Sequence, residues 1–369
     1  MLYETANEHG GDIYSGEIKL DYSVNLNPLG NCDAVVNAIK EAASDAGVYP
    51  DPYCRKLIAA IAEKEGVSEK NIICGNGGAE IIYAYCDTVL PKRAAVAIPS
   101  FSEYSTAVLR NGAELVKYHT REDNGFALDE GMIDFIGTQR PDLLFLCNPN
   151  NPDGRLIPDE LLDKILKICD ETGCAVFLDE CFLELSDGFD RSGISLINEH
   201  PGLFILRAFT KTFSMAGIRL GYGISADTEL LKRISQRLQP WNVSVIAQKA
   251  GLAALNEQSF IEAGRITVMQ ERSRFSQQLS ECGIKVCESQ ANYMLIKIPE
   301  EVQSGDDDTN DLASGSAFVK DSFGDRMLQK GILIRNCRNF EGLGRGWYRI
   351  CIKGRADNDF FLKTVRSVL

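Results

Sequence analysis

Short apolar runs of strand length alternate with longer, helix-like segments between residues 71 and 223. The runs 71–74, 143–147 and 175–178 are mostly apolar, which favours strands that are buried on both faces. The segments with the length and apolar character of helices are 80–90, 230–238 and 245–255. This alternation predicts an α/β fold built as a three-layer, mostly parallel sheet.

Residues that could bind a ligand or take part in a reaction follow four of the predicted strands. The glycine-rich stretch 75–79 precedes an apolar helix, where bare N–H groups and the helix dipole would attract an anion. Asn151, Asp179 and Lys211 each lie just beyond another apolar run. Because ligands of open α/β sheets bind beyond the carboxyl ends of the strands, we expect these four features to form one site.

Each feature also has a simpler interpretation when taken alone. The glycines suit a plain turn, Asn151 a turn, Asp179 a helix cap and Lys211 a solvated surface position. Their order and spacing favour a shared site. Lys211, with Arg219 eight residues later, suits a Schiff base beside a phosphate group, which indicates the cofactor pyridoxal 5'-phosphate.

Over nearly its whole length the chain resembles the fold type I pyridoxal-phosphate enzymes of the class I and II aminotransferase superfamily. The resemblance implies that Lys211 carries the cofactor, Asp179 pairs with its ring nitrogen, and Asn151 binds its phenolic oxygen. Phe101 would stack on the ring. The phosphate contacts implied are Gly78, Ala79, Thr210 and Arg219. Catalysis is assigned to Lys211 and Asp179.

The resemblance also implies how the substrate binds and how subunits associate. Arg349 matches the arginine that holds the α-carboxylate, and Arg335 is expected to bind a second anionic group. Tyr49 matches the tyrosine that reaches the phosphate of a neighbouring subunit, which predicts a homodimer with shared active sites. His9 and Asn25 are further candidate substrate contacts, His9 for a substrate phosphate.

Two departures from the common family pattern narrow the expected reaction. Phe182 stands where most members have a tyrosine three residues after the ring-nitrogen aspartate, and Ala208 replaces a frequent phosphate-binding hydroxyl. A phenylalanine at this position resembles the pattern of the threonine-phosphate decarboxylases of cobamide synthesis. The segments 9–12, 25–30, 332–337 and 339–343 resemble the same group. Histidinol-phosphate aminotransferases are the alternative, in which case Phe182 reflects neutral drift.

Length and composition support a two-domain enzyme. The chain has 369 residues, more than a single domain usually holds. By the resemblance, segments 1–40 and 261–369 form a smaller α+β domain, and 41–260 forms the large cofactor domain. The acidic tract 303–311 is expected to be a surface loop that does not bind metal. No two of the three histidines have metal-ligand spacing.

Charge and targeting signals exclude several partners. A net charge of -13 and a pI near 4.9 disfavour nucleic acid and anionic membranes, so a small anionic amino acid needs a local cationic pocket. The twelve cysteines lie mostly in apolar runs and are expected to be reduced. The N-terminus lacks a basic start and apolar stretch, which predicts a cytoplasmic protein.

Two functions of other classes fit less well. A ligand sensor fused to a DNA-binding module would need a spare segment and a basic surface. A Rossmann-like nucleotide binder that uses residues 75–78 would lack the spaced GxGxxG pattern and leave Lys211 without a role.

Overall fold

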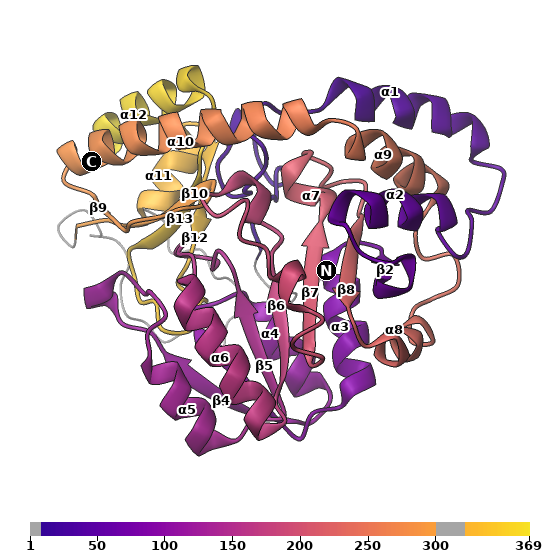
Figure 1. Ribbon diagram of the computed structural model, residues 1–369. Coiled ribbons are helices and arrows are strands. Elements are labelled where there is room, and N and C mark those ends of the chain that lie inside the picture. Colours follow the sequence, from indigo (N-terminus) through magenta and orange to yellow (C-terminus); the bar gives the residue numbers. More distant parts are fainter. Residues whose placement is uncertain (1–8, 300–321) are drawn as a thin grey trace.

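A seven-stranded sheet forms the centre of the computed structural model, which describes residues 9–299 and 322–369 (Figure 1). In sheet order its strands are β2 (Ile72–Gly75), β8 (Gly221–Ser225), β7 (Leu203–Ala208), β6 (Ala175–Asp179), β5 (Leu143–Cys147), β3 (Arg93–Ile98) and β4 (Glu114–His119). The five strands from β7 to β4 are parallel, and β8 runs antiparallel between β7 and β2. The predicted mostly parallel sheet is confirmed.

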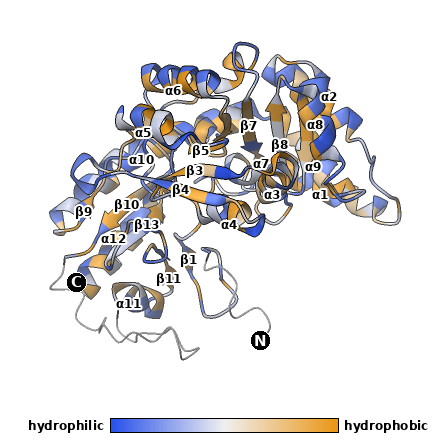
Figure 2. Cartoon of the chain, turned by 90° about the horizontal axis from the view of Figure 1, so that it is seen from below, coloured by the Kyte–Doolittle hydropathy of each residue, from blue (hydrophilic) through white to orange (hydrophobic). Residues whose placement is uncertain are grey.

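Helices cover both faces of this sheet, which makes three layers. Apolar side chains of one set pack on one face, and those of a second set pack on the other. The first set is α2 (Arg55–Glu65), α5 (Gly131–Gln139), α6 (Asp159–Thr172) and α9 (Val245–Leu255). The second set is α3 (Gly78–Val89), α4 (Ser102–Arg110) and α8 (Thr228–Ser235). Figure 2 shows that the strands between these layers are mainly hydrophobic, while the helices carry hydrophilic residues as well.

Alternation along the central strands explains why both faces are apolar. In β7, Leu203 and Ile205 pack in the first layer, whereas Phe204 and Leu206 pack in the second. A strand whose side chains are buried on both sides reads as a continuous apolar run. The sequence pattern predicted such runs for β2, β5 and β6, and the observed bounds differ by one residue at most.

A second, antiparallel sheet lies next to the large one, and α10 (Gln258–Glu281) spans the distance between them (Figure 1). Its strands are β12 (Arg335–Asn336), β13 (Trp347–Cys351), β10 (Tyr293–Lys297) and β9 (Lys285–Val286). A separate apolar core joins this sheet to α10, α11 (Phe323–Gln329) and α12 (Arg355–Val368).

The N-terminal part of the chain contacts both regions. β1 (Leu20–Asp21) pairs in parallel with β11 (Ile332–Leu333), whereas α1 (Asp33–Ala42) packs against α9. The predicted domain limits at 40 and 260 fall inside α1 and α10, so the division itself stays a prediction. The acidic tract 303–311 lies outside the described residues. Across the described ranges, no helix combines the length and apolarity that crossing a bilayer requires.

The packing of β8 against β7 yields a stability prediction. A Cβ on Gly223 would lie 2.2 Å from the ring of Phe204, which is fully buried. Gly223→Ala should therefore lower the free energy of unfolding by about 1–3 kcal/mol through overpacking. Gly137→Ala is the control, because a Cβ there meets no atom within 4 Å and alanine favours the helix α5. Urea titration measures both, and equal effects would contradict the packing argument.

Candidate active site

A cavity of about 400 Å³ opens beyond the carboxyl ends of β5, β6 and β7. Twelve of the thirteen residues predicted from the sequence line it. They are His9, Asn25, Gly78, Ala79, Phe101, Asn151, Asp179, Thr210, Lys211, Arg219, Arg335 and Arg349. The fold thus gathers residues from both ends of the chain and from the carboxyl ends of five strands, which are β2, β3, β5, β6 and β7. Their individual roles stay predictions.

Tyr49 is the predicted residue that does not line the cavity. Its side chain is 76% exposed and packs against Trp241, with ring centroids 4.6 Å apart. Val48 and Tyr53 beside it are also exposed. Within one chain Tyr49 therefore has no contact with the cavity, and its predicted role in a partner's site requires a dimer.

Lys211 lies in the short helix α7 (Phe209–Thr212), which begins directly after β7. Burial lowers the pKa of its amine to about 8, and the positive charges of Arg349 and Arg219 act in the same direction. The neutral form of Lys211 is thus far more populated near neutral pH than it would be for an exposed lysine, whose pKa is about 10.4. An uncharged amine is the form that attacks a carbonyl carbon, so this environment suits a Schiff-base lysine.

Asp179 ends β6 and is buried at the floor of the cavity. Burial raises the pKa of its carboxyl above the usual value, while hydrogen bonds from Cys181 and Tyr104 oppose that rise. The Tyr104 hydroxyl donates to Oδ2 at 2.7 Å, and the Cys181 N–H donates to Oδ1 at 2.9 Å. A carboxylate held in this way can pair with a protonated ring nitrogen.

Tyr104 was not among the residues predicted from the sequence. It is buried on α4, where its ring stacks on Phe145 and meets Phe101 edge to face with centroids 5.6 Å apart. Tyr104 therefore contacts both Asp179 and the predicted stacking residue Phe101. The spacing of Phe101 and Tyr104 could have indicated this contact, because residues three positions apart at the start of a helix lie on the same face.

The amino end of α3 and Arg219 form the predicted anion seat. Gly77 caps α3 with a φ of 83°, a conformation that favours glycine. A Cβ on Gly77 would lie 2.7 Å from the Arg219 guanidinium, so the missing side chain leaves room for that group. N–H groups of a helix terminus beside a guanidinium fit a phosphate group.

The opposite side of the cavity carries buried polar groups that suit an anionic substrate. Arg349 donates from Nη1 to Asn151 Oδ1 and from Nη2 to the Ser23 carbonyl at 2.7 Å. Within residues 9–299 and 322–369, the Arg349 Nε and both polar atoms of the Asn25 side chain have no hydrogen-bond partner. Because buried polar groups normally pair, a bound ligand would satisfy these atoms.

His9 and Phe182 also border the cavity. His9 Nε2 lies 3.1 Å from the buried carboxylate of Glu103, which also accepts from the Tyr83 hydroxyl at 2.5 Å. One ring nitrogen of His9 is thus already engaged. Phe182 packs on Tyr293, and its ring centroid lies 5.7 Å from the Lys211 Nζ. Among the described residues, no group of three histidine, cysteine or acidic side chains could hold a metal ion.

A lysine of lowered pKa, a buried aspartate and a cationic seat on this three-layer fold define a class of enzymes that use pyridoxal phosphate. The model of the family aminotransferase class I and II matches residues 17–363, and the chain belongs to this family. It is a pyridoxal-phosphate-dependent decarboxylase or aminotransferase.

The relatives of known name include both decarboxylases and aminotransferases. The chain is 32% identical to the threonine-phosphate decarboxylase of Salmonella typhimurium over 98% of its length and 96% of the relative. It is also 32% identical to the histidinol-phosphate aminotransferase of Shouchella clausii, over 96% and 91% respectively. The crystal structure of the histidinol-phosphate aminotransferase from Clostridium acetobutylicum superposes with a TM-score of 0.83, at 31% identity, covering 95% of this chain and 98% of that one.

The hydrogen bond from Tyr104 to Asp179 predicts that removing the Tyr104 hydroxyl weakens cofactor binding, whereas removing another buried tyrosine hydroxyl does not. Tyr104→Phe removes a donor that favours the ionised carboxyl, so the pKa of Asp179 should rise further and the apoprotein should bind pyridoxal phosphate about fivefold more weakly. Tyr85→Phe is the control, since the buried Tyr85 hydroxyl has no partner among the described residues. Fluorescence titration of both variants measures the effect, and equal affinities would refute it.

The surroundings of Lys211 predict a pH dependence. Only the neutral amine captures an aldehyde, so the rate of covalent cofactor capture should rise with pH around a midpoint near 8. Arg349→Gln removes a positive charge that disfavours the ammonium form, so the pKa and the midpoint should both move up. Stopped-flow absorbance across pH 6–10 gives both midpoints; an unmoved midpoint would show that Arg349 does not act on Lys211.

Proposed function

We propose that the enzyme decarboxylates L-threonine O-3-phosphate and that it acts in general on a small phosphorylated amino acid. The observation that carries the substrate class is the pairing of Arg335 with Arg349. These residues are direct cross-strand partners on β12 and β13, both are buried, and both line the cavity.

A buried pair of like charges opposes folding, because neighbouring cations on one sheet face repel each other. The Arg335 guanidinium lies over the ring of Phe340 and donates to Asn339 Oδ1 at 2.8 Å, which orients it beside Arg349. A ligand with two separate anionic groups would match the positions of both arginines. A phosphorylated amino acid has a carboxylate for Arg349 and a phosphate for Arg335.

The residues around the cavity divide the remaining work. When bound, the cofactor ring supplies an electron sink for the bond that breaks at the substrate α-carbon. Asp179 holds a proton at the ring nitrogen, and the Lys211 amine moves a proton at the α-carbon. Arg349 and Asn25 orient the carboxylate, and the seat at Gly78 and Arg219 holds the cofactor phosphate.

The choice between decarboxylation and transamination depends on the orientation of the substrate. Arg335 and Arg349 would hold the substrate in one orientation, and that orientation would decide whether the bond to the carboxylate or the bond to the hydrogen breaks. Phe182 supports decarboxylation, because a phenylalanine at this position resembles the pattern of the threonine-phosphate decarboxylases. Histidinol-phosphate transamination is the second candidate, supported by the similarity to the Shouchella clausii enzyme.

We also infer a homodimer with shared active sites, in the cytoplasm. Val48, Tyr49, Tyr53 and Trp241 present exposed apolar surface, and such patches mark interaction sites. A second copy covering this patch would bring Tyr49 toward the partner's phosphate seat.

The proposed reaction is tested by product analysis. The protein loaded with pyridoxal phosphate is incubated with L-threonine O-3-phosphate, and separately with histidinol phosphate plus 2-oxoglutarate, followed by mass spectrometry. We expect carbon dioxide and aminopropanol phosphate from the first mixture. Lys211→Ala should reduce turnover on the order of a hundredfold or more, because it removes the proton-transfer group.

Glutamate formed only in the second mixture would reject the decarboxylase and establish the aminotransferase. Turnover that persists undiminished in Lys211→Ala would reject the assignment of Lys211.

A further inference from the structure

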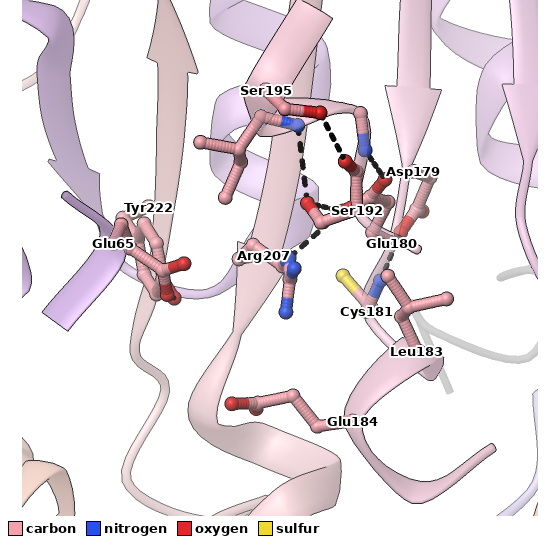
Figure 3. A network of polar contacts seen from close by, with 12 residues as sticks. Glu65, Asp179, Glu180, Cys181, Leu183, Glu184, Ser192, Ser195, Arg207 and Tyr222 are labelled. Atoms are coloured by element: carbon pink, nitrogen blue, oxygen red, sulfur yellow. Dashed lines mark hydrogen bonds and ion pairs between the residues drawn. The ribbon is translucent and has the colours of Figure 1, made fainter. Parts of the chain in front are cut away.

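A buried ion pair lies directly behind the cavity and takes no part in the chemistry described above. Arg207 on β7 donates from Nε to Glu180 Oε2 at 3.0 Å, and both side chains are almost fully buried. Glu180 also accepts from the Ser192 hydroxyl at 2.7 Å and from the Gly193 N–H at 2.8 Å. Figure 3 shows Glu180, Ser192 and Arg207 pointing toward one another.

Neither member of this pair faces the cavity. Along β7 the side chains of Leu206 and Ala208 line the cavity, so Arg207 between them points to the opposite face of the sheet. Asp179 likewise lines the cavity, whereas Glu180, the next residue, does not. The ion pair and the cavity are therefore separated by the backbone of β6 and β7.

Further charged groups surround Arg207 on that face (Figure 3). Tyr222 on β8 donates to Glu65 Oε1 at 2.6 Å, and Lys64 donates to Glu184 at 2.5 Å. Burial lowers the pKa of Arg207, but the carboxylates, Glu180 foremost and then Glu65 and Glu184, outweigh it and raise that pKa above its usual value. Arg207 is thus a fixed cation at the centre of the network.

This network is attached to the two predicted catalytic residues through their chain neighbours. Glu180 follows Asp179, and its N–H donates to the Leu206 carbonyl of β7 at 2.9 Å. Thr212 follows Lys211, and its interaction with the Glu184 carboxyl lowers the pKa of that group. Asp179 and Lys211 lie on different elements, so contacts between β6, β7 and α7 determine how far apart they are.

Stability alone is a weak reason for such a network. Buried ion pairs can often be replaced by apolar residues of similar volume without loss of stability, because removing charges from water is costly. Apolar replacements would not preserve the defined arrangement that hydrogen bonds and charges give to these groups. The network therefore points to a requirement for geometry at the ends of β6 and β7.

We propose that Glu180 and Arg207 are positioning residues, which fix the end of β6 against the end of β7 so that Asp179 and Lys211 reach the same bound ring. This inference rests on the proposed roles of Asp179 and Lys211. A catalytic site loses activity steeply when reacting groups are misplaced by about 1 Å, so a rigid link behind the site has a direct chemical consequence.

The test compares two ligands of the apoprotein. Pyridoxal 5'-phosphate can bond covalently to Lys211, whereas pyridoxine 5'-phosphate has the same ring and phosphate but an alcohol in place of the aldehyde. The ratio of their affinities measures how well Lys211 is aligned with a ring held by Asp179. Loss of general stability weakens both ligands and leaves the ratio unchanged.

In Glu180→Gln the ratio should fall roughly tenfold, because the charge that orients Arg207 is lost while the side-chain shape is kept. Glu271→Gln is the matched control. The buried Glu271 forms an ion pair with the partly buried Arg274 at 2.6 Å on α10 and does not line the cavity. The control should lower the melting temperature without changing the ratio.

If Glu180→Gln does not fold, Ser192→Ala tests the same role, because it removes one hydrogen-bond donor to Glu180. This variant should lower the affinity ratio roughly twofold to threefold. An unchanged ratio in the folded variants overturns the positioning role. A wild-type protein that binds both ligands equally, with no cofactor fixed by borohydride, would instead reject the proposed role of Lys211.

Discussion

The parallel pairing of β5, β6 and β7 is the constraint on which the site depends. Cys147 is in register with Asp179, and Asp179 with Leu206, so these strands end at one edge of the sheet. The loop with Asn151 and the helix with Lys211 both begin at that edge. A shift in register would separate groups that must act on one bound ring, which explains why the strands are buried on both faces and fixed by packing from two helical layers.

Electrostatics at the site oppose the charge of the whole molecule. The chain has a net charge of -13, yet Arg219, Arg335 and Arg349 border one cavity. Arg335 and Arg349 are buried, so solvent screens their charges little, and they would attract anionic ligands strongly. Burial lowers the pKa of Lys211, and the charges of Arg349 and Arg219 add to that effect. Asp179 is held by hydrogen bonds from Tyr104 and Cys181, which oppose the effect of burial on its pKa. Burial thus favours the uncharged lysine, whereas the hydrogen bonds from Tyr104 and Cys181 favour the ionised aspartate.

The two regions of the protein contribute different parts of the site. The large sheet carries the groups predicted to hold the cofactor, while β12 and β13 supply Arg335 and Arg349, which are proposed to bind the substrate. The segment from His9 to Asn25 lies between them, and β1 within it pairs with β11. The substrate groups are therefore placed by contacts between segments more than 300 residues apart, such as that of Ser23 with Arg349.

The sequence by itself determined the alternation of strands and helices, the positions of β2, β5 and β6, and the residues at their ends, because apolar periodicity and turn residues act over a few neighbouring positions. It placed Asn151, Asp179 and Lys211 together through the rule for open sheets. The family resemblance added Arg349, and the expectation of a doubly anionic substrate added Arg335. Only the tertiary structure decided the antiparallel insertion of β8, the contact of Tyr104 with Asp179, and the ion pair behind the site. These features depend on which strands become neighbours and in what register, and that is decided by packing between distant parts of the chain.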